Sequence, residues 1–502
     1  MPNSPSEPSG SSGSSELSGS TGVAAGGAGY DLAVIGAGPA GLAGVVAAAD
    51  RGLRCVLLDA GGGLGGQYYR HPAAELRAAR PDRLHHHWST FTALSRRLAE
   101  HREAGRVEVR LRHHVVLVQG VPLPGAPPVS GASTGWRLHT SSGVESGAGS
   151  TGRVDARAVL LATGAYERQL PFPGWTLPGV VTAGGAQAML KAGLVLPGRR
   201  IVVAGSGPLL LAVAASLAAA GAEVPALLEA GGYLGYARSP GTLAAVPGKL
   251  AEGVVHGAAL ARHAVRPRTA HAVIEAHGTD RVRAVTVARL DRTWRPLPGT
   301  ERRIACDALA VGHGLVPQLE LATELGAATR TVPDGTLALR VDAGQRTTVP
   351  GLWAAGETCG VGGAELALAE GELAAATIAG QQPPAALLAR RRRLRAFAEL
   401  MAAVHRPGPG WTGWLSPETE VCRCEEVPLA RITEAVQELG AGDARTVKLL
   451  TRAGMGWCQG RMCGPAVACL AGAGAGAEEP AADRRPFSCP VRLGDLAELP
   501  SD

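Results

Sequence analysis

The sequence lacks the motifs of several common enzyme classes. It contains no HExxH zinc-protease motif, and no closely spaced pair of cysteines occurs before Cys422. A disulfide reductase needs such a pair beside its cofactor, so we do not expect thiol–disulfide exchange. Aromatic residues make up only 4% of the chain, and the formal net charge is +6 over 502 residues. This modest charge, without interleaved aromatic residues, gives no reason to expect nucleic-acid binding.

The sequence also lacks a membrane or secretory segment. Residues 1–29 are rich in serine and glycine, without a basic start or an apolar core, and we expect a disordered tail there. The uncharged run at 201–222 is long enough to suggest a transmembrane helix. Its internal Gly-Ser-Gly-Pro at 205–208 instead indicates a strand, a turn and a buried helix. Because the nine cysteines have no secretory context, we expect a reducing, cytoplasmic environment.

Glycine and small apolar residues are abundant instead. The chain has 70 glycines and 46% hydrophobic residues, which suits buried parallel strands and closely packed helices. Its length exceeds what one core usually organises, so we expect about three or four units. The densest basic run covers 390–393 and Arg395, and we expect it on the solvent face of a helix.

A nucleotide-binding pattern begins at residue 30. An apolar strand at 30–35 runs into Gly-Ala-Gly-Pro-Ala-Gly at 36–41 and then an alanine-rich helix. The three glycines permit the tight turn, the approach of a pyrophosphate and close packing of helix on strand, and the helix N-terminus faces the phosphates. An acid ends the next strand 23 residues after the first glycine, where it can hold ribose hydroxyls. The predicted contacts are Gly36, Gly38, Pro39, Ala40, Gly41 and Asp59.

FAD and NAD share this fingerprint, so other segments must distinguish them. A glycine-rich loop at 62–66 follows the acid closely and lets a cofactor lie against the backbone. The predicted contacts in this loop are Gly66 and Gln67.

A second strand, turn and helix pattern occurs further along the chain. A strand at 200–204 runs into Gly-Ser-Gly-Pro-Leu-Leu at 205–210. Leu210 replaces the third glycine, and its side chain should push the helix away from the strand. The acid that ends the following strand favours NAD over NADP. A working nicotinamide site and a structural relic both stay open. The candidate contacts are Gly205, Gly207 and Glu229.

Four cysteines near the C-terminus indicate a metal cluster. One residue separates Cys422 from Cys424, four separate Cys458 from Cys463, and 33 lie between the two pairs. A [2Fe–2S] centre requires four thiolates, and each pair can grip one iron. Zinc sites usually space their cysteines by about two to four residues in both pairs, so C-x-C favours iron–sulfur over zinc or a disulfide. Predicted helices at 428–439 and 444–453 bring the pairs together.

These residues carry a family resemblance. The segments CRCEEV and GWCQGRMCGP resemble the bacterioferritin-associated-ferredoxin type of [2Fe–2S] domain at the C-terminus of the larger subunit of opine oxidases, hydrogen cyanide synthases and D-hydroxyproline dehydrogenases. The resemblance covers about residues 30–470. It implies a glutathione-reductase-type oxidoreductase of the α/β class. The fold would contain two Rossmann-like dinucleotide-binding domains, the second inserted in the first, and a small helical [2Fe–2S] domain.

The resemblance extends to two further flavin segments. VLLATGAYERQLPFPGW at 159–175 resembles the ATG motif of such flavoproteins. The segment 349–357 resembles the strand whose closing acid holds the ribityl chain, and the helix after it points its N-terminus at the flavin pyrimidine edge. Here the acid is glutamate rather than the usual aspartate, which has a shorter reach. The FAD contacts implied are Thr163, Gly164, Gly356 and Glu357.

The resemblance implies an electron-relay function. A flavin accepts two electrons as a hydride, and a [2Fe–2S] centre carries one at a time. In the resembled family a smaller flavin subunit oxidises the substrate amine or imino acid at its C–N bond, and the larger subunit passes electrons to a downstream acceptor. This implies a hetero-oligomer, in the cytoplasm or at the inner face of the membrane. Some relatives carry a different adenine nucleotide in the larger subunit, or FMN at the subunit boundary. No catalytic residue is indicated.

Two other functions stay open at this point. One is a self-contained NAD(P)H:acceptor reductase that uses the second nucleotide site. The other is a non-enzymatic assembly subunit whose cluster senses redox state. The predicted organisation is a disordered tail at 1–29, the first part of an FAD-binding domain at 30–195, an inserted nucleotide-binding domain at 196–317, the return part of the FAD-binding domain at 318–385, a basic helix and Pro/Gly linker at 386–418, the [2Fe–2S] domain at 419–472 and a loose tail at 473–502.

Overall fold

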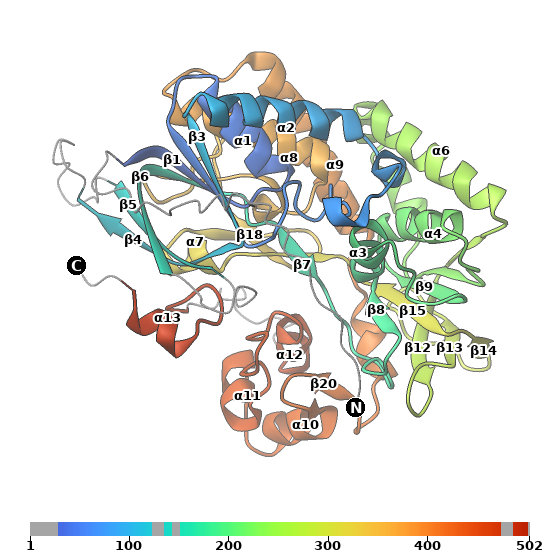
Figure 1. The fold of residues 1–502 in the computed structure, drawn as a ribbon. Helices are drawn as coiled ribbons and strands as arrows, with labels where there is room; N and C mark the ends of the chain where they lie inside the picture. Colours follow the sequence, from blue (N-terminus) through green and yellow to red (C-terminus); the bar gives the residue numbers. More distant parts are fainter. Residues whose placement is uncertain (1–28, 123–134, 143–150, 473–484, 500–502) are drawn as a thin grey trace, which may run out of the picture.

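The computed structural model describes residues 29–122, 135–142, 151–472 and 485–499. The predicted disordered tail at 1–29 lies outside these residues except for Gly29. The described chain forms two Rossmann-like units and a small C-terminal module, which Figure 1 shows in orange and red below the two units. Among the described helices, none combines the length and the apolarity that a membrane crossing requires.

The first unit is built on a seven-stranded sheet. Its central strand β1 lies between β2 and β6, and the three strands run parallel. The late strand β19 also pairs with β6, so the chain returns to this sheet after the second unit, as the predicted insertion requires. The strands are β1 (Tyr30–Ile35), β2 (Cys55–Asp59), β3 (Val107–Leu111), β4 (His113–Val121), β5 (Gly135–Ser142), β6 (Thr151–Leu161) and β19 (Leu352–Ala354).

Alternate residues of β1 enter two different cores. Leu32 and Val34 pack with the helices on one face of the sheet. Ala33 and Ile35 pack with β4, β5 and residues near 320 on the other face. Because side chains alternate along a strand, a strand covered on both faces is an uninterrupted apolar run, as this segment is.

Two helices from distant parts of the sequence cross on this sheet. They are α1 (Pro39–Ala49) and α8 (Ala364–Ile378). A Cβ added at Gly371 would overlap the carbonyl oxygen of Ala40, and one added at Gly44 would overlap the side chain of Leu160. The backbones of α1 and α8 can approach this closely only because residue 371 is glycine. α2 (Trp88–Glu103) also packs against α1, and α9 (Ala385–Val404) packs against α8.

The second unit has a five-stranded parallel sheet of its own, in the order β11-β10-β9-β15-β8. A separate antiparallel sheet of β12, β13 and β14 lies beside it. The helices of this unit are α3 (Ala183–Gly193), α4 (Leu209–Ala219), the short α5 (Pro240–Ala244) and α6 (Pro247–Arg262). The strands are β8 (Val180–Thr182), β9 (Ile201–Gly205), β10 (Leu227–Glu229), β11 (Pro267–Thr269), β12 (His271–His277), β13 (Ala284–Arg289), β14 (Arg302–Ala305) and β15 (Ala308–Gly312).

A two-stranded ribbon joins the two units, with one strand leading into the second unit and the other leading back to the first. Its strands are β7 (Ala165–Glu167) and β16 (Leu315–Pro317), which run antiparallel. The short helix α7 (Glu320–Glu324) follows, and then the hairpin of β17 (Thr329–Thr331) and β18 (Leu337–Leu339).

The C-terminal module contains both predicted helices between its cysteine pairs. Its elements are β20 (Glu420–Cys422), β21 (Val427–Pro428), α10 (Leu429–Gln437), α11 (Ala444–Thr451) and α12 (Gly464–Leu470). The indole of Trp175 donates to the carbonyl of Glu420 at 2.7 Å. The indole of Trp414 donates to the carbonyl of Trp294 at 3.0 Å. These buried contacts fix the module, so the Pro/Gly linker holds it at a set position.

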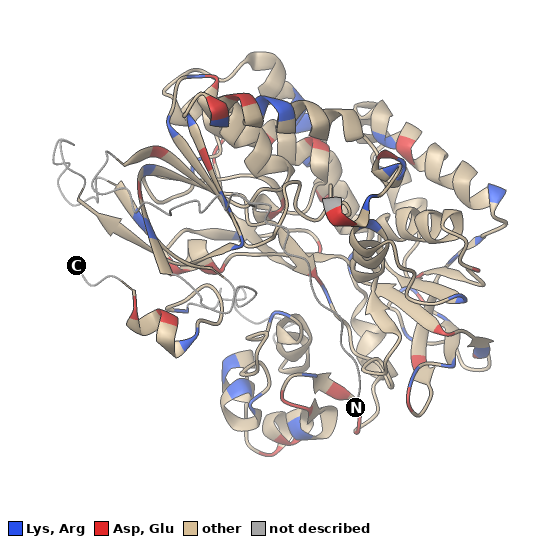
Figure 2. Ribbon diagram, viewed as in Figure 1, with Lys and Arg blue, Asp and Glu red and all other residues tan. Residues whose placement is uncertain are grey.

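Two sequence-based expectations were wrong in part. We expected a loose tail at 473–502, of which 473–484 and 500–502 lie outside the described residues. In the described part, Ser488 donates its amide to Val116 and its hydroxyl to Val115 on β4, and α13 (Leu493–Ala497) follows. We also expected the arginine run on a solvent face, and Arg390, Arg392 and Arg393 are exposed, but Arg395 is buried. Both errors arose because the polar residues find partners far away in the sequence. Figure 2 shows basic and acidic residues interspersed over both units and the module.

We predict that Gly371→Ala destabilises the first unit by about 1–3 kcal/mol, because the new methyl group meets the α1 backbone, which cannot move aside easily. Thermal unfolding followed by circular dichroism measures this. Gly257→Ala in α6 is the matched control, since nothing lies within 4 Å of a Cβ there. It should be neutral or stabilising by up to about 1 kcal/mol. Equal effects of the two changes would contradict the close crossing.

Candidate cofactor sites

The first fingerprint forms the turn between β1 and α1, and the space beside Gly38 in this turn is open. Gly36 has φ +106°, and a Cβ there would overlap the carbonyl of Ala162 at the end of β6. A Cβ at Gly41 would overlap the carbonyl of Gly36, whereas nothing lies within 4 Å of one at Gly38. Pro39 and Ala40 open α1, and no side chain caps this N-terminus. Free backbone amides at a helix N-terminus suit a phosphate group.

The predicted acid and the glycine loop both lie at this turn. Asp59 accepts hydrogen bonds from the amides of Ala37 at 2.5 Å and Gly61 at 2.6 Å. The backbone of Gly66 lies against Gly38, since a Cβ at Gly66 would come 2.8 Å from the Gly38 Cα. The loop therefore folds over the fingerprint. The side chain of Gln67 accepts a hydrogen bond from Arg70 at 2.6 Å.

The ATG segment lies at the end of β6 and is held by Gln318. The Thr163 hydroxyl donates to the Gln318 carbonyl at 3.1 Å, and the Gln318 amide donates to the Gly164 carbonyl at 2.9 Å. Gly164 has φ +79°, and nothing lies within 4 Å of a Cβ there. The segment thus adds a second open backbone turn at the carboxyl edge of the sheet.

Glu357 binds the loop before α8. Its carboxylate accepts from the amides of Gly362 at 2.9 Å and Gly363 at 3.0 Å. Burial raises the pKa of Glu357, although these two amide hydrogen bonds oppose the rise. The longer side chain thus reaches its own loop, where it shapes the approach to the α8 N-terminus.

A carboxylate that the sequence reasoning missed supports Gly356. Glu370 is fully buried on α8 and accepts from the Gly356 amide at 3.0 Å. Its other oxygen pairs with Arg395 at 2.6 Å and with Arg391 at 3.2 Å. The available signal was a glutamate within an apolar helix together with two arginines spaced by four residues. A buried charge requires such partners.

The second fingerprint has a similar turn but different surroundings. Gly205 has φ +140° and packs against the carbonyl of Gly312, and Gly207 faces open space. Leu210 is buried in the core of this unit, and α4 begins at Leu209, one position later relative to its fingerprint than α1. Where Leu210 replaces the third glycine, the helix therefore begins one residue later than it does at the first fingerprint.

The acid of the second site is covered by the end of α9. Glu229 is 1% exposed and accepts from the amides of Gly207 at 2.9 Å and Gly231 at 3.0 Å. His405 is also buried, and its Nδ1 lies 3.6 Å from the Glu229 carboxylate. Burial raises the pKa of Glu229, but His405 and the two amides outweigh it and hold this pKa below its usual range. The hydroxyl of Ser206 donates to the His405 carbonyl at 3.3 Å.

The four predicted cysteines come together, but they pair between the two loops, whereas the sequence predicted one pair within each loop. The thiol of Cys463 donates to Cys422, and Cys424 and Cys458 are hydrogen-bonded to each other. The contact with Cys463, helped by backbone amides including that of Gly454, lowers the pKa of Cys422 to about 6. Cys422 and Cys463 are buried, and Cys424 is exposed.

This arrangement fits a two-iron cluster. In the described part of the chain, no group of three or more Cys, His, Asp or Glu residues is placed to hold a single metal ion. Each iron of a [2Fe–2S] centre needs two thiolates from the protein, and the two cysteine pairs supply them. A Cβ at Gly456 would overlap the Cβ of Cys424, so the second cysteine loop passes directly behind the first.

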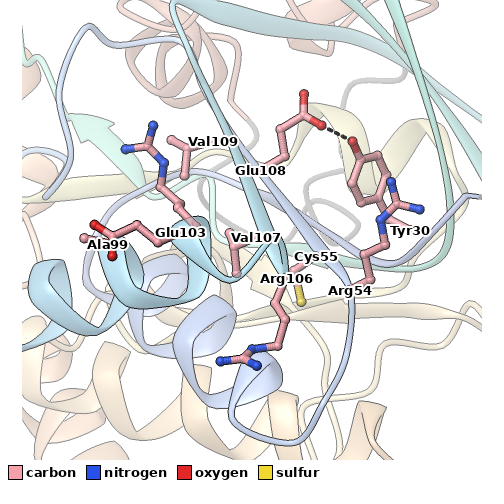
Figure 3. A pocket seen from close by; sticks show the side chains of 11 residues that line it. Tyr30, Arg54, Cys55, Ala99, Glu103, Arg106, Val107, Glu108 and Val109 are labelled. Atoms are coloured by element: carbon pink, nitrogen blue, oxygen red, sulfur yellow. Dashed lines mark hydrogen bonds between the residues drawn. The ribbon is translucent and has the colours of Figure 1, made fainter. Parts of the chain in front are cut away.

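A separate cavity of about 600 Å³ lies at the other end of the first sheet. Figure 3 shows Tyr30, Arg54 and Val107 in its lining, at the start of β1 and β3 and just before β2. Nucleotides bind at the carboxyl ends of parallel strands, so the amino ends are the wrong place for the cofactor.

Comparison with known families agrees with this geometry. The family model of the pyridine nucleotide-disulphide oxidoreductases matches residues 30–382, and that of the BFD-like [2Fe-2S] binding domain matches residues 420–470. The chain therefore belongs to the pyridine nucleotide-disulphide oxidoreductase family and carries a BFD-like [2Fe–2S] domain. It is a flavin oxidoreductase that binds FAD and a [2Fe–2S] cluster.

Two curated relatives match nearly the whole chain. Hydrogen cyanide synthase subunit HcnB from Pseudomonas aeruginosa is 35% identical over 443 residues, covering 86% of this chain and 90% of the relative. An opine oxidase subunit from Agrobacterium tumefaciens is 33% identical over 491 residues, covering 94% and 92%. The crystal structure of L-proline dehydrogenase from P. horikoshii has a TM-score of 0.64 at 20% identity, covering 93% of this chain and 79% of that one, which shows a shared fold.

We predict that Cys458→Ser removes the cluster, because one iron then lacks a thiolate. Iron analysis and the visible spectrum of the purified protein measure this. Cys469→Ser is the matched control, since Cys469 is a half-buried cysteine in the same module outside the two pairs. It should retain full iron. Retention of both irons in Cys458→Ser, or zinc in the wild type, would contradict the assignment.

Proposed function

We propose that this chain is the electron-transferring larger subunit of a flavin-dependent dehydrogenase that oxidises a C–N bond together with a smaller flavin subunit. The observation that carries the proposal is a flavin unit and a [2Fe–2S] module in one chain, with the module fixed to the second unit by the buried indole of Trp175. Relatives named as subunits of opine oxidase and hydrogen cyanide synthase support a hetero-oligomer.

The first nucleotide site is the place we assign to FAD. The open turn at Gly38, the uncapped α1 N-terminus and the covering loop at Gly66 support this assignment. Asp59 lies where it can hold a ribose, and Glu357 arranges the loop before the α8 N-terminus. The proposed contacts are Gly36, Gly38, Pro39, Ala40, Gly41, Asp59, Gly66, Gln67, Thr163, Gly164, Gly356 and Glu357, with Cys422, Cys424, Cys458 and Cys463 for the cluster.

The chemistry follows from the two cofactors together. FAD supplies two-electron chemistry, and the cluster supplies single-electron delivery. The residues of this chain bind and orient the cofactors, and the substrate oxidised with the partner is a small amine, opine or imino acid. The reaction is completed by a downstream one-electron acceptor. We place the complex in the cytoplasm, where clusters survive, and no contact among the described residues supports attachment to a membrane.

We infer further that the second site does not take up nicotinamide. His405 and the end of α9 cover Glu229, the residue that would hold the ribose. An occupied site would require this segment to move away and leave a buried carboxylate without its histidine partner. The covered site serves instead as an anchor for the arm that carries the cluster module.

We predict that NADH does not bleach the flavin of the purified chain under anaerobic conditions, because the second site is covered. Stopped-flow absorbance measures this, with dithionite as the positive control. Prompt bleaching by NADH would favour the self-contained reductase and would contradict the proposed function.

We predict that a C–N substrate, added together with the smaller flavin subunit, reduces the cluster of this chain. Anaerobic EPR spectroscopy detects the reduced cluster, and the same mixture without substrate is the control. A cluster that stays oxidised while the partner flavin is reduced would favour the redox-sensing assembly role instead.

A further inference from the structure

A chain of contacts joins the flavin-site turn to the cluster loop. Gln318 is hydrogen-bonded to both Thr163 and Gly164 at the end of β6. Two residues later, Glu320 opens α7. The Glu320 carboxylate pairs with the guanidinium of Arg461 at 2.7 Å, and Arg461 lies between the cysteines of the second loop. This ion pair connects the first unit to the cluster module.

Arg461 also binds the backbone on its own side of the contact. Its Nη1 donates to the carbonyl of Cys458 at 3.4 Å, and its Nη2 donates to the carbonyl of Ser488 in the C-terminal segment. The side chains of Arg461 and Glu320 are only 17% and 10% exposed. A nearly buried ion pair with further hydrogen bonds has a defined geometry, unlike a pair on the surface.

The ribbon of β7 and β16 is tied to the same turn. β7 starts directly after the ATG turn, and its partner β16 ends at Pro317, just before Gln318. The flavin-site turn, the ribbon and α7 therefore follow one another without a break.

We propose that the Glu320–Arg461 ion pair is a positioning element that holds the Cys458 edge of the cluster at electron-transfer distance from the flavin site. The proposal rests on the proposed function, since it requires reduced FAD as the electron donor. With FAD held at the first site and the cluster held by the four cysteines, each transfer would take one electron from reduced FAD and reduce one ferric iron to ferrous. An external one-electron acceptor must reoxidise the cluster before the second electron follows, and the flavin protons pass to solvent.

The indole anchors of the module act at a different place. Trp175 binds at Glu420, before the first cysteine loop, and Trp414 binds within the linker. Loss of the ion pair should therefore loosen the second cysteine loop without detaching the module. For this reason a change at Arg461 tests position rather than folding.

The test compares electron transfer with local order in Arg461→Met and Glu320→Gln. We expect full iron content, an unchanged rate of flavin reduction, and cluster reduction slowed severalfold, because the rate of electron transfer falls steeply as the distance between the two centres grows. Stopped-flow absorbance after rapid flavin reduction gives the transfer rate. Hydrogen exchange should rise at 315–320 and 458–463, which is a readout independent of activity.

Two further variants separate the loss of this ion pair from a general effect of removing an arginine from the module. Arg452→Met is the matched control, because Arg452 pairs with Glu425 at 2.8 Å within the module, away from the ion pair to the first unit. It should transfer electrons at the wild-type rate. Arg461→Lys keeps the charge and should recover part of the loss. A wild-type rate in Arg461→Met would overturn the positioning role and leave the proposed function intact. A wild-type cluster that reduced flavin cannot reduce would overturn the proposed function itself.

Discussion

The close crossing of α1 and α8 is the constraint on which the rest of the structure depends. The two helices come from the first and last parts of the flavin unit, and small residues at Ala40, Gly44 and Gly371 let their backbones touch. The crossing closes the first unit around the inserted second one. It also places two helix N-termini at the same edge of the sheet, where their partial positive charges favour a nucleotide.

A buried carboxylate secures the same region from behind. Glu370 holds the amide of Gly356 with one oxygen and two arginines of α9 with the other. A charge without partners in this position would be very costly, so α9 has to lie where it does. Because α9 is fixed, its end at His405 comes to rest on Glu229 in the second unit. One helix thus stabilises the flavin site and covers the other nucleotide site.

The cluster module is held at several points rather than carried on a flexible arm. Trp175 and Trp414 bind it to its surroundings through buried indoles, and Arg461 joins its second cysteine loop to α7. Cys424 is exposed, whereas Cys422 and Cys463 are buried. Rigid placement suits an electron relay, in which the distance between the centres must stay constant.

Local sequence alone determined the nucleotide fingerprints, the four cluster cysteines and the helices between them, because glycine turns, apolar runs and thiolate spacing depend on residues close together in the chain. The insertion of one unit in the other also followed from the order of these motifs. The partners of charged residues depended on tertiary structure. The sequence around Arg395 predicts a solvent-exposed helix face, and the C-terminal sequence predicts a loose tail. Arg395 and Ser488 nevertheless form hydrogen bonds with residues more than 20 positions away in the sequence. The covering of Glu229 and the pairing of Glu320 with Arg461 likewise arise only when distant segments meet, since a buried charge is stable only where the whole fold supplies its counterpart.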